Sequence, residues 1–290
     1  MQSAHDRVFE IDGRRLAAKL YGPEDGAPTL ALHGWMDNAA SFDRLAPLLG
    51  SRRICALDFA GHGRSDHLPA GAHYSWFTYL SDAFAVADAL GWQRFTLIGH
   101  SMGAHISLYM GAVAPARVDR TVLIDAIGHP GLNPAKLAAE TEKALTRFRN
   151  FRLRSTPLYE TFEAMLGPRM NTVGNITEAA ARILLERGVR PYQNGFTWTS
   201  DARLMYPDPT RLTEEQVMGF IQAVESPSLL LLGEAGWPWT PDFIARRTGA
   251  HRHLRTLRLP GGHHLHLEDT VDAVAEEVCG FLAADSPQLD

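Results

Sequence analysis

Short runs of apolar residues alternate along this chain with longer stretches in which apolar residues recur at helical spacing. The runs are continuous, which is typical of strands buried on both faces of a parallel sheet. They occupy residues 14–21, 28–32, 52–59, 94–100, 118–125, 226–234 and 253–259. The helical patterns occupy residues 41–49, 76–90, 101–114, 241–248 and the stretch from about 270. This alternation predicts an α/β fold with a mostly parallel sheet and helices on both faces.

The alternation stops between residues 130 and 225. That segment contains helical patterns and turn residues but no comparable run of Val, Ile and Leu. One helix is expected to begin at Thr177, as its amino-terminal cap, and to end at Gly188. We therefore predict a core made of residues 1–129 and 226–290, with a helical cap inserted at 130–225.

Composition and charge narrow the class of protein. With 290 residues and 45% hydrophobic content, the chain can bury a large core without a disulfide or a metal. Its formal net charge is −5 and it has no block of like charges, so we expect a small-molecule substrate and no nucleic-acid partner. No apolar run is long enough to cross a membrane and no signal peptide precedes the first strand, which favours the cytoplasm and no membrane insertion. The oligomeric state is left open.

The two cysteines, Cys55 and Cys279, lie far apart, each within an apolar segment. We therefore predict buried free thiols rather than a disulfide.

A serine stands between two glycines where a predicted strand meets a predicted helix. The stretch Leu-Ile-Gly-His-Ser-Met-Gly covers residues 97–103, with glycines at positions 99 and 103 and the serine at 101. Glycines leave room for a sharp turn, which would hold the Ser101 hydroxyl out at the carboxyl end of the sheet, beside the positive end of the helix. The pattern therefore favours a nucleophilic serine.

Four stretches resemble the α/β-hydrolase family, and the resemblance covers nearly the whole chain. They are LHGW at 32–35, DFAGHGRS at 58–65, GHSMG at 99–103 and GGHHLHLED at 261–269. Three longer or additional stretches are similar to the serine-hydrolase-like branch of that family. They are LHGWMDNAASFDRLAPLL at 32–49, ILLERGV at 183–189 and TSDARL at 199–204. The resemblance implies an α/β-hydrolase fold, with 58–65 as a turn that braces the sheet.

The resemblance implies a base and an acid that follow the serine in the chain. The family's Gly-His pair, followed five residues later by Glu, corresponds to Gly262, His263 and Glu268, so His263 is the favoured base and His264 the second candidate. His266 is expected to support the loop. No carboxylate or cysteine has a spacing that would complete a metal site with these histidines, so we expect no metal and no cofactor.

The acid departs from the commonest family pattern. The turn in which most relatives carry an aspartate has Gly236 in this chain. A second arrangement, that of haloalkane dehalogenase-like members, puts the acid after the preceding strand, where Asp125 ends the run 118–125. Asp125 is therefore the favoured acid, and Glu234 and Asp242 stay as alternatives.

The family stabilises the oxyanion with two backbone N–H groups, which correspond here to those of Trp35 and Met102. Asp37, Asn38 and His264 are possible substrate-pocket residues, and Asp37 and Asn38 are equally suited to capping the next helix.

The resemblance implies a serine hydrolase that cleaves small to medium, apolar carboxylic esters or thioesters through an acyl-enzyme. Hydrolysis of carbon–carbon bonds and cofactor-free haloperoxidase-like chemistry use the same residues and stay as alternatives. A non-catalytic binding protein is a third reading, which the presence of Ser101, Asp125 and His263 disfavours. Haloalkane dehalogenases and epoxide hydrolases have an aspartate at the position of Ser101.

Overall fold

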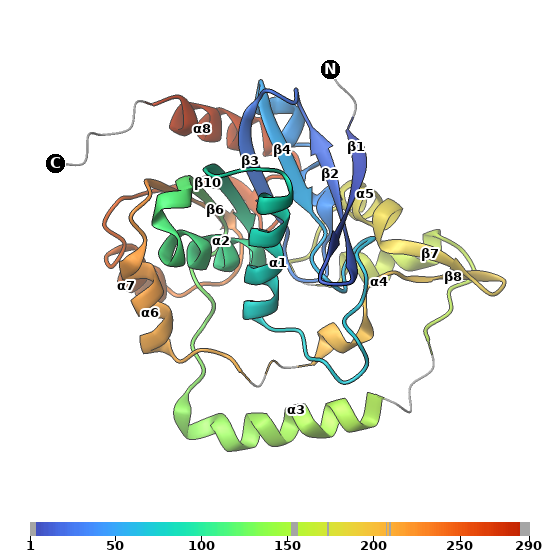
Figure 1. Cartoon of the computed structure of the whole chain (residues 1–290). Helices are drawn as coiled ribbons and strands as arrows, with labels where there is room; N and C mark the ends of the chain where they lie inside the picture. Colours follow the sequence, from blue (N-terminus) through green and yellow to red (C-terminus); the bar gives the residue numbers. More distant parts are fainter. Residues whose placement is uncertain (1–3, 152–155, 173, 207, 209, 285–290) are drawn as a thin grey trace.

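Eight strands form one sheet at the centre of the molecule (Figure 1). The computed structural model describes residues 4–151, 156–172, 174–206, 208 and 210–284. Within them the strands of this sheet are β1 (His5–Ile11), β2 (Arg14–Tyr21), β3 (Ala27–Leu32), β4 (Arg52–Leu57), β5 (Phe95–His100), β6 (Val118–Ile124), β9 (Ser228–Ala235) and β10 (Leu254–Gly262). Their order across the sheet is β1-β2-β4-β3-β5-β6-β9-β10. The β1/β2 and β2/β4 pairs are antiparallel and the others are parallel, which confirms the predicted mostly parallel sheet.

Helices cover both faces of this sheet. The α-helices of the described residues are α1 (Trp76–Ala89), α2 (Met102–Val113), α3 (Leu137–Phe151), α4 (Leu166–Met170), α5 (Glu178–Gly188), α6 (Glu214–Ala223), α7 (Pro241–Thr248) and α8 (Val271–Ala283). Leu80 of α1, Leu108 of α2 and Ile221 of α6 belong to one apolar cluster on the first face. Val274 and Val278 of α8 belong to the cluster on the second face. The predicted α/β architecture is therefore confirmed.

The central strands are mostly apolar because both of their faces are buried. In β3, Leu30 and Leu32 pack into the first cluster and Ala31 into the second. In β9, Leu230 and Leu229 divide between the two clusters in the same way. Successive side chains of a strand point to opposite faces, so a continuous apolar run is what a sheet covered by helices on both sides requires.

The chain leaves the central sheet after β6 and returns to it at β9. In between it forms α3 to α6 and the two-stranded hairpin β7 (Val189–Tyr192) and β8 (Gly195–Trp198). As predicted, α5 begins after Thr177, whose hydroxyl accepts a hydrogen bond from the Ala180 N–H, and ends at Gly188. In Figure 1, α3 lies along the outside of the molecule, separated from the sheet. The division into a core and a cap at residues 130–225 stays a prediction.

Three elements differ from the expectations. The strand β1 was not predicted, because it lies at the sheet edge and buries only Phe9 and Ile11. The helix expected at 41–49 is wrong, since the chain there forms two short 3-10 turns, Ala39–Phe42 and Ala46–Leu48. The hairpin β7–β8 lies where only helices were expected, because most of its residues are not buried and give no apolar run.

Two further expectations concern the thiols and the membrane. Both cysteines are free, as predicted, but only Cys55 is buried and Cys279 is half-buried. Among the described residues, no helix has the length and apolar character needed to cross a bilayer.

Candidate active site

Ser101 lies at the sharp turn between β5 and α2, in backbone geometry that a serine rarely adopts. Its φ is 52°, and α2 begins at the next residue. The two glycines of the motif make this turn possible. A Cβ at Gly99 would lie 2.3 Å from the Gly103 carbonyl oxygen, and a Cβ at Gly103 would lie 1.9 Å from the Leu32 carbonyl oxygen. The spacing seen in the sequence therefore reflects close packing of the turn against β3 and α2.

The structure brings Asp125 and His263 together. Asp125 follows β6 and His263 follows β10, and the Nδ1 atom of His263 lies 2.6 Å from the Oδ2 atom of Asp125. Asp125 also accepts hydrogen bonds from the N–H groups of Gly233 at 3.0 Å and Trp237 at 2.7 Å. These bonds hold the carboxylate in place. The Nε2 atom of His263 is buried and has no hydrogen-bond partner among the described residues, so it is free to bond to a reacting group.

His263 lies close to the serine turn. Its imidazole ring is 4.7 Å from the ring of His100, the residue before Ser101, measured between ring centroids. In addition, the Nε2 atom of His100 lies 2.9 Å from the His263 carbonyl oxygen. The loop that carries His263 is thus bound directly to the end of β5.

The other candidates for base and acid lie elsewhere. Glu234 and Asp242 are exposed, and neither has a contact with His263. The Nε2 atom of His264 lies 3.2 Å from Asp37, and that of His266 lies 2.8 Å from the Ser41 hydroxyl. The candidate acids were Asp125, Glu234 and Asp242, and the candidate bases were His263 and His264. Among the described residues, only Asp125 and His263 of these candidates form an acid–base contact.

Gly236 leaves the space that the Asp125 carboxylate occupies. A Cβ built at Gly236 would lie 2.4 Å from Asp125 Oδ1 and 2.6 Å from Oδ2. A side chain at position 236 and the carboxylate from β6 therefore exclude each other. This explains why glycine stands where the resembled family most often has an aspartate.

A cavity of about 530 Å³ opens at Ser101. Trp35 and Met102, whose backbone N–H groups are the expected oxyanion donors, line the same cavity. The walls are rich in aromatic and aliphatic side chains. They include Tyr74, Trp76, Tyr79, Ile106, Tyr109, Leu204, Leu212, Val217, Trp237 and Trp239. Burial holds the pKa of His105, another wall residue, well below its usual value, so this imidazole is neutral at pH 7.

Asp37 contacts three separate segments around this site. Its carboxylate is buried and pairs with Arg169 of α4. The same carboxylate lies 3.2 Å from the Nε2 atom of His264 and 3.3 Å from the Nδ1 atom of His100. Burial alone would raise the pKa of Asp37. The charges of His264 and Arg169, together with a hydrogen bond from His264, hold that pKa well below its usual value. Asp37 is thus an anion that ties α4 to the residues beside Ser101 and His263.

The predicted pocket residues Asp37 and Asn38 line a second cavity of about 200 Å³, not the one that opens at Ser101. Asn38 caps the 3-10 turn Ala39–Phe42 and donates a hydrogen bond to the Leu184 carbonyl oxygen at 2.8 Å. The structure therefore shows Asn38 as a helix cap and Asp37 in an ion pair. Contact of Asp37, Asn38 and His264 with substrate stays a prediction.

Among the described residues, one cluster of side chains has the spacing of metal ligands. Ligand atoms of Asp37, His100 and His264 lie within 4.8 Å of one another. The guanidinium of Arg169 already pairs with the Asp37 carboxylate, so a metal bound there would have a buried cation beside it. The contacts support an ion-pair network at this place.

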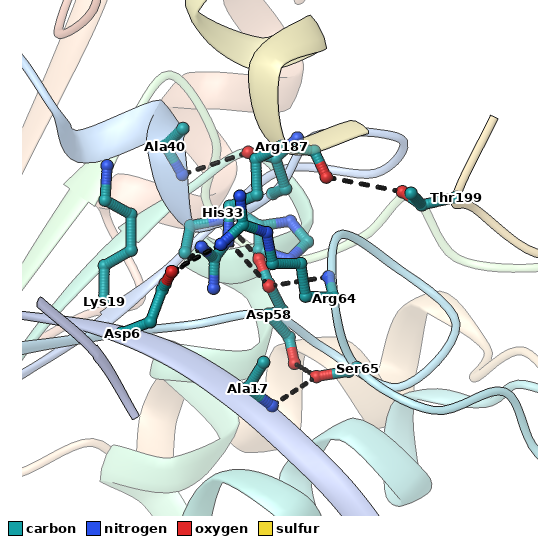
Figure 2. A network of polar contacts seen from close by, with 12 residues as sticks. Asp6, Ala17, Lys19, His33, Ala40, Asp58, Arg64, Ser65, Arg187 and Thr199 are labelled. Atoms are coloured by element: carbon teal, nitrogen blue, oxygen red, sulfur yellow. Dashed lines mark hydrogen bonds and ion pairs between the residues drawn. The ribbon is translucent and has the colours of Figure 1, made fainter. Parts of the chain in front are cut away.

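Asp58 is the centre of a second buried network, shown in Figure 2. Its Oδ1 atom accepts a hydrogen bond from the Ala39 N–H at 2.7 Å, and its Oδ2 atom accepts from the Arg64 N–H at 2.9 Å and from Arg187 Nε at 2.8 Å. Arg187 belongs to α5 and also pairs with Asp6 of β1. Asp58 thus connects the loop after β3, which contains Trp35, to a helix of the 130–225 segment.

Sequence reasoning missed Arg169 and Arg187. Each is at least nine-tenths buried and pairs with an aspartate more than 120 residues away, Asp37 for Arg169 at a separation of 132 and Asp58 for Arg187 at 129. An arginine in a polar helical stretch gives no local signal of burial, so only the fold reveals these pairs.

A family model described as alpha/beta hydrolase fold matches residues 28–270. A serine hydrolase-like protein of Danio rerio is 32% identical to this chain, over 99% of this chain and 90% of the relative. A probable serine hydrolase of Drosophila melanogaster is also 32% identical, over 91% of this chain and 83% of the relative. Both relatives match almost the whole chain.

Solved structures agree with this likeness. The crystal structure of a hypothetical protein from Pseudomonas aeruginosa is 41% identical, covers 96% of this chain and 99% of that chain, and has a TM-score of 0.92. The thioesterase domain from the curacin biosynthetic pathway is 23% identical, with a TM-score of 0.83 over 96% of this chain and 99% of that domain. The second likeness shows the fold alone.

Proposed function

The chain belongs to the α/β-hydrolase fold family, and on this basis we propose that it is a serine hydrolase of small to medium, apolar carboxylic esters or thioesters. Ser101 is the nucleophile, His263 the base and Asp125 the acid that orients the base. The observation that carries the proposal is the 2.6 Å contact between His263 Nδ1 and Asp125 Oδ2 beside a serine held at φ 52°. The serine hydrolase-like relatives support the same conclusion.

The reaction proceeds in two halves. In the first, Ser101 Oγ attacks the substrate carbonyl while His263 Nε2 accepts its proton, and the C–O or C–S bond breaks as the leaving group takes that proton. In the second, water attacks the acyl-enzyme with the same histidine as base, which releases the acid and restores Ser101. The N–H groups of Trp35 and Met102 stabilise the negative oxygen of each tetrahedral intermediate.

Asp125 acts through His263. It fixes the ring so that Nδ1 donates to the carboxylate and Nε2 faces the reacting serine, and it stabilises the imidazolium that forms during the reaction. The hydrogen bonds from Gly233 and Trp237 hold Asp125 in the orientation that this role needs.

The walls of the larger cavity favour an apolar group next to the scissile bond. The residues that surround Ser101 there are mostly aromatic or aliphatic, and a closed apolar wall excludes water from the reacting carbonyl. A volume of about 530 Å³ lies within the range of small-molecule sites.

Covalent labelling with a fluorophosphonate tests the nucleophile. We expect the intact mass to increase by one adduct in the native protein and in Ser51→Ala, an exposed control serine, and not in Ser101→Ala. Turnover of p-nitrophenyl esters should disappear in the same variant. An adduct that persists in Ser101→Ala would assign the reactivity to another residue and overturn the proposal.

The same assay separates the competing functions. A labelled Ser101 without ester turnover would favour carbon–carbon bond hydrolysis or haloperoxidase-like chemistry. No adduct on the folded native protein would favour a binding protein on a hydrolase fold.

A further inference from the structure

The charged residues that line the larger cavity are mostly basic, although the chain as a whole carries a formal net charge of −5. They come from α3 and from positions 203, 208 and 211. They are Glu140, Lys143, Arg147, Arg203, Asp208 and Arg211. Four cations and two carboxylates thus face a cavity that otherwise has apolar walls.

Two of these cations form no ion pair with the described residues, although Glu140 lies three positions before Lys143 on the same helix. Lys143 and Arg147 are exposed residues four positions apart on α3, so they lie on the same face of that helix. Neither forms an ion pair with any residue that the structure describes, although both line the cavity. Arg203 differs, because it pairs with Asp201 at 2.6 Å and also donates to the carbonyl oxygen of Leu68 at 2.5 Å. The charge of Arg203 is therefore already balanced by Asp201.

Arg211 has donors that the described residues do not satisfy. Its Nη2 atom reaches the Pro130 carbonyl oxygen only at 3.5 Å, and its Nε atom is buried without a hydrogen-bond partner in the described part of the chain. A guanidinium presents five N–H donors in one plane, which suits two oxygens of a carboxylate or a phosphate. Asp208, which lines the same cavity, forms no ion pair with Arg211 in the described part of the chain, and its Oδ1 atom accepts from the backbone N–H and the hydroxyl of Thr210.

We propose that the substrate is an ester or thioester with an anionic group, a carboxylate or a phosphate, away from the scissile bond, and that Lys143, Arg147 and Arg211 bind this group. This inference rests on the proposed function, since it places the scissile carbonyl at Ser101. The apolar part of the substrate then lies against the aromatic walls, and the anion lies beside α3 and Arg211.

Matched pairs of substrates test the charge requirement. The first pair is p-nitrophenyl hydrogen adipate and its neutral monomethyl ester, which differ in a terminal carboxylate. The second pair is an acyl 4′-phosphopantetheine thioester and the same acyl group on pantetheine, which differ in one phosphate of the leaving thiol. We expect kcat/KM to favour the anionic member of at least one pair by about tenfold, mainly through KM, and the ratio to fall as salt is raised. The pair that shows the preference identifies which part of the substrate carries the charge.

Charge removal tests the residues. In the double variant Arg147→Gln/Arg211→Gln, the ratio of kcat/KM for the anionic over the neutral member should fall several-fold towards one. Arg149→Gln is the matched control, because Arg149 is an exposed arginine on the same helix that does not line the cavity. It should keep the native ratio. Equal kcat/KM for both members of both pairs in the native protein, or a ratio that survives the double variant, would overturn the inference.

Binding separates this inference from the proposed function. Tryptophan fluorescence of Ser101→Ala, with Trp237 and Trp239 in the cavity wall, measures the affinity for each substrate without turnover. A preference of this variant for the anionic members would support the anion site even if the native protein hydrolysed none of them. Rapid hydrolysis with no preference in either assay would leave the hydrolase standing and remove the anion site.

Discussion

Gly236 is a residue whose missing side chain leaves room for the carboxylate of Asp125, the proposed acid. Most of the resembled family carries an aspartate in this turn, whereas here the carboxylate arrives from Asp125 at the end of β6 and fills the space beside Gly236. The same spatial position can therefore be reached from two neighbouring strands. Because the two side chains would overlap, only one of the two strands can place a side chain at this position.

We expect Gly236→Ala to lower kcat on an activated ester by roughly 10- to 100-fold, a part of what acid–base catalysis contributes. The new methyl group would lie 2.4 Å from Asp125 Oδ1, so the carboxylate must move and its hydrogen bonds with Trp237 and His263 must weaken. Steady-state kinetics measure this change, with KM expected to stay close to the native value.

Gly219→Ala is the control for this variant. Nothing lies within 4 Å of a Cβ at Gly219, which is inside α6, so this change should keep turnover and add up to about 1 kcal/mol of stability. Glu234→Gln should also keep turnover, because Glu234 is exposed and has no contact with His263. Native activity in Gly236→Ala combined with a loss in Glu234→Gln would move the acid to Glu234.

Single residues of the site differ in how far the sequence could predict them. Ser101 is recognisable because its glycines are neighbours in the chain, and His263 because its loop pattern is local. The pairing of Asp37 with Arg169 joins residues 132 positions apart, and nothing near either residue marks it. Local motifs therefore predict the reacting groups, and the ion pairs that hold the surrounding loops require the fold.

The helix α5 is held to the sheet by charge as well as by apolar contacts. Figure 2 shows Arg187 between Asp58 and Asp6. Asp58 also accepts hydrogen bonds from the backbone N–H groups of residues 39 and 64. The side chain of Arg187 is 4% exposed and that of Asp58 is fully buried. Removing one partner of such a pair leaves a buried charge without compensation, which is more costly than the pair is favourable.

We expect Arg187→Met to lower the free energy of unfolding by about 3 kcal/mol, because Asp58 would keep its charge and lose its cation. Arg182→Met on the same helix is the matched control. Arg182 pairs with Glu178 on the exposed surface at 2.8 Å, a contact worth less than about 0.5 kcal/mol. Urea denaturation of both variants measures the difference. Equal stability of the two variants would show that the Arg187 network contributes nothing to holding α5.

The elements that the sequence failed to predict share a physical cause. The edge strand β1 has one side chain in the core for every two or three outside it, so its pattern resembles a polar loop. The segment 41–49 has enough apolar residues for a helix, but Pro47 lacks the N–H that a continuous helix would use, and the chain turns twice instead. The strands β3, β5, β6 and β9 were predictable because burial on both faces makes most of their positions apolar.

Across the whole molecule, buried neutral histidines connect stability to pH. Burial lowers the pKa of His62 to about 3 and that of His100 to about 3, whereas both would titrate near 6.5 in the unfolded chain. Between pH 6.5 and 3 the unfolded chain therefore binds more protons than the folded one. The contribution of these groups to stability is complete above pH 6.5 and is lost as the pH falls through that range.

We expect the free energy of unfolding to fall between pH 7.5 and 5.0 by up to about 1.4 kcal/mol per pH unit for each of these histidines, below pH 6.5. Urea denaturation at several pH values measures the slope. His62→Gln should have a shallower slope than the native protein, and His253→Gln, which changes an exposed histidine, should keep the native slope. A free energy of unfolding that does not change between pH 7.5 and 5.0 would contradict the expectation.

The ion pairs of Arg169 and Arg187 also order the events of synthesis. Their partners precede them in the chain, Asp37 by 132 residues, Asp58 by 129 and Asp6 by 181. All three aspartates have therefore left the ribosome before either arginine is made. Both arginines thus enter a chain that already contains their partners, whereas His263 follows Arg187 by 76 positions and is among the last residues of the site to be made.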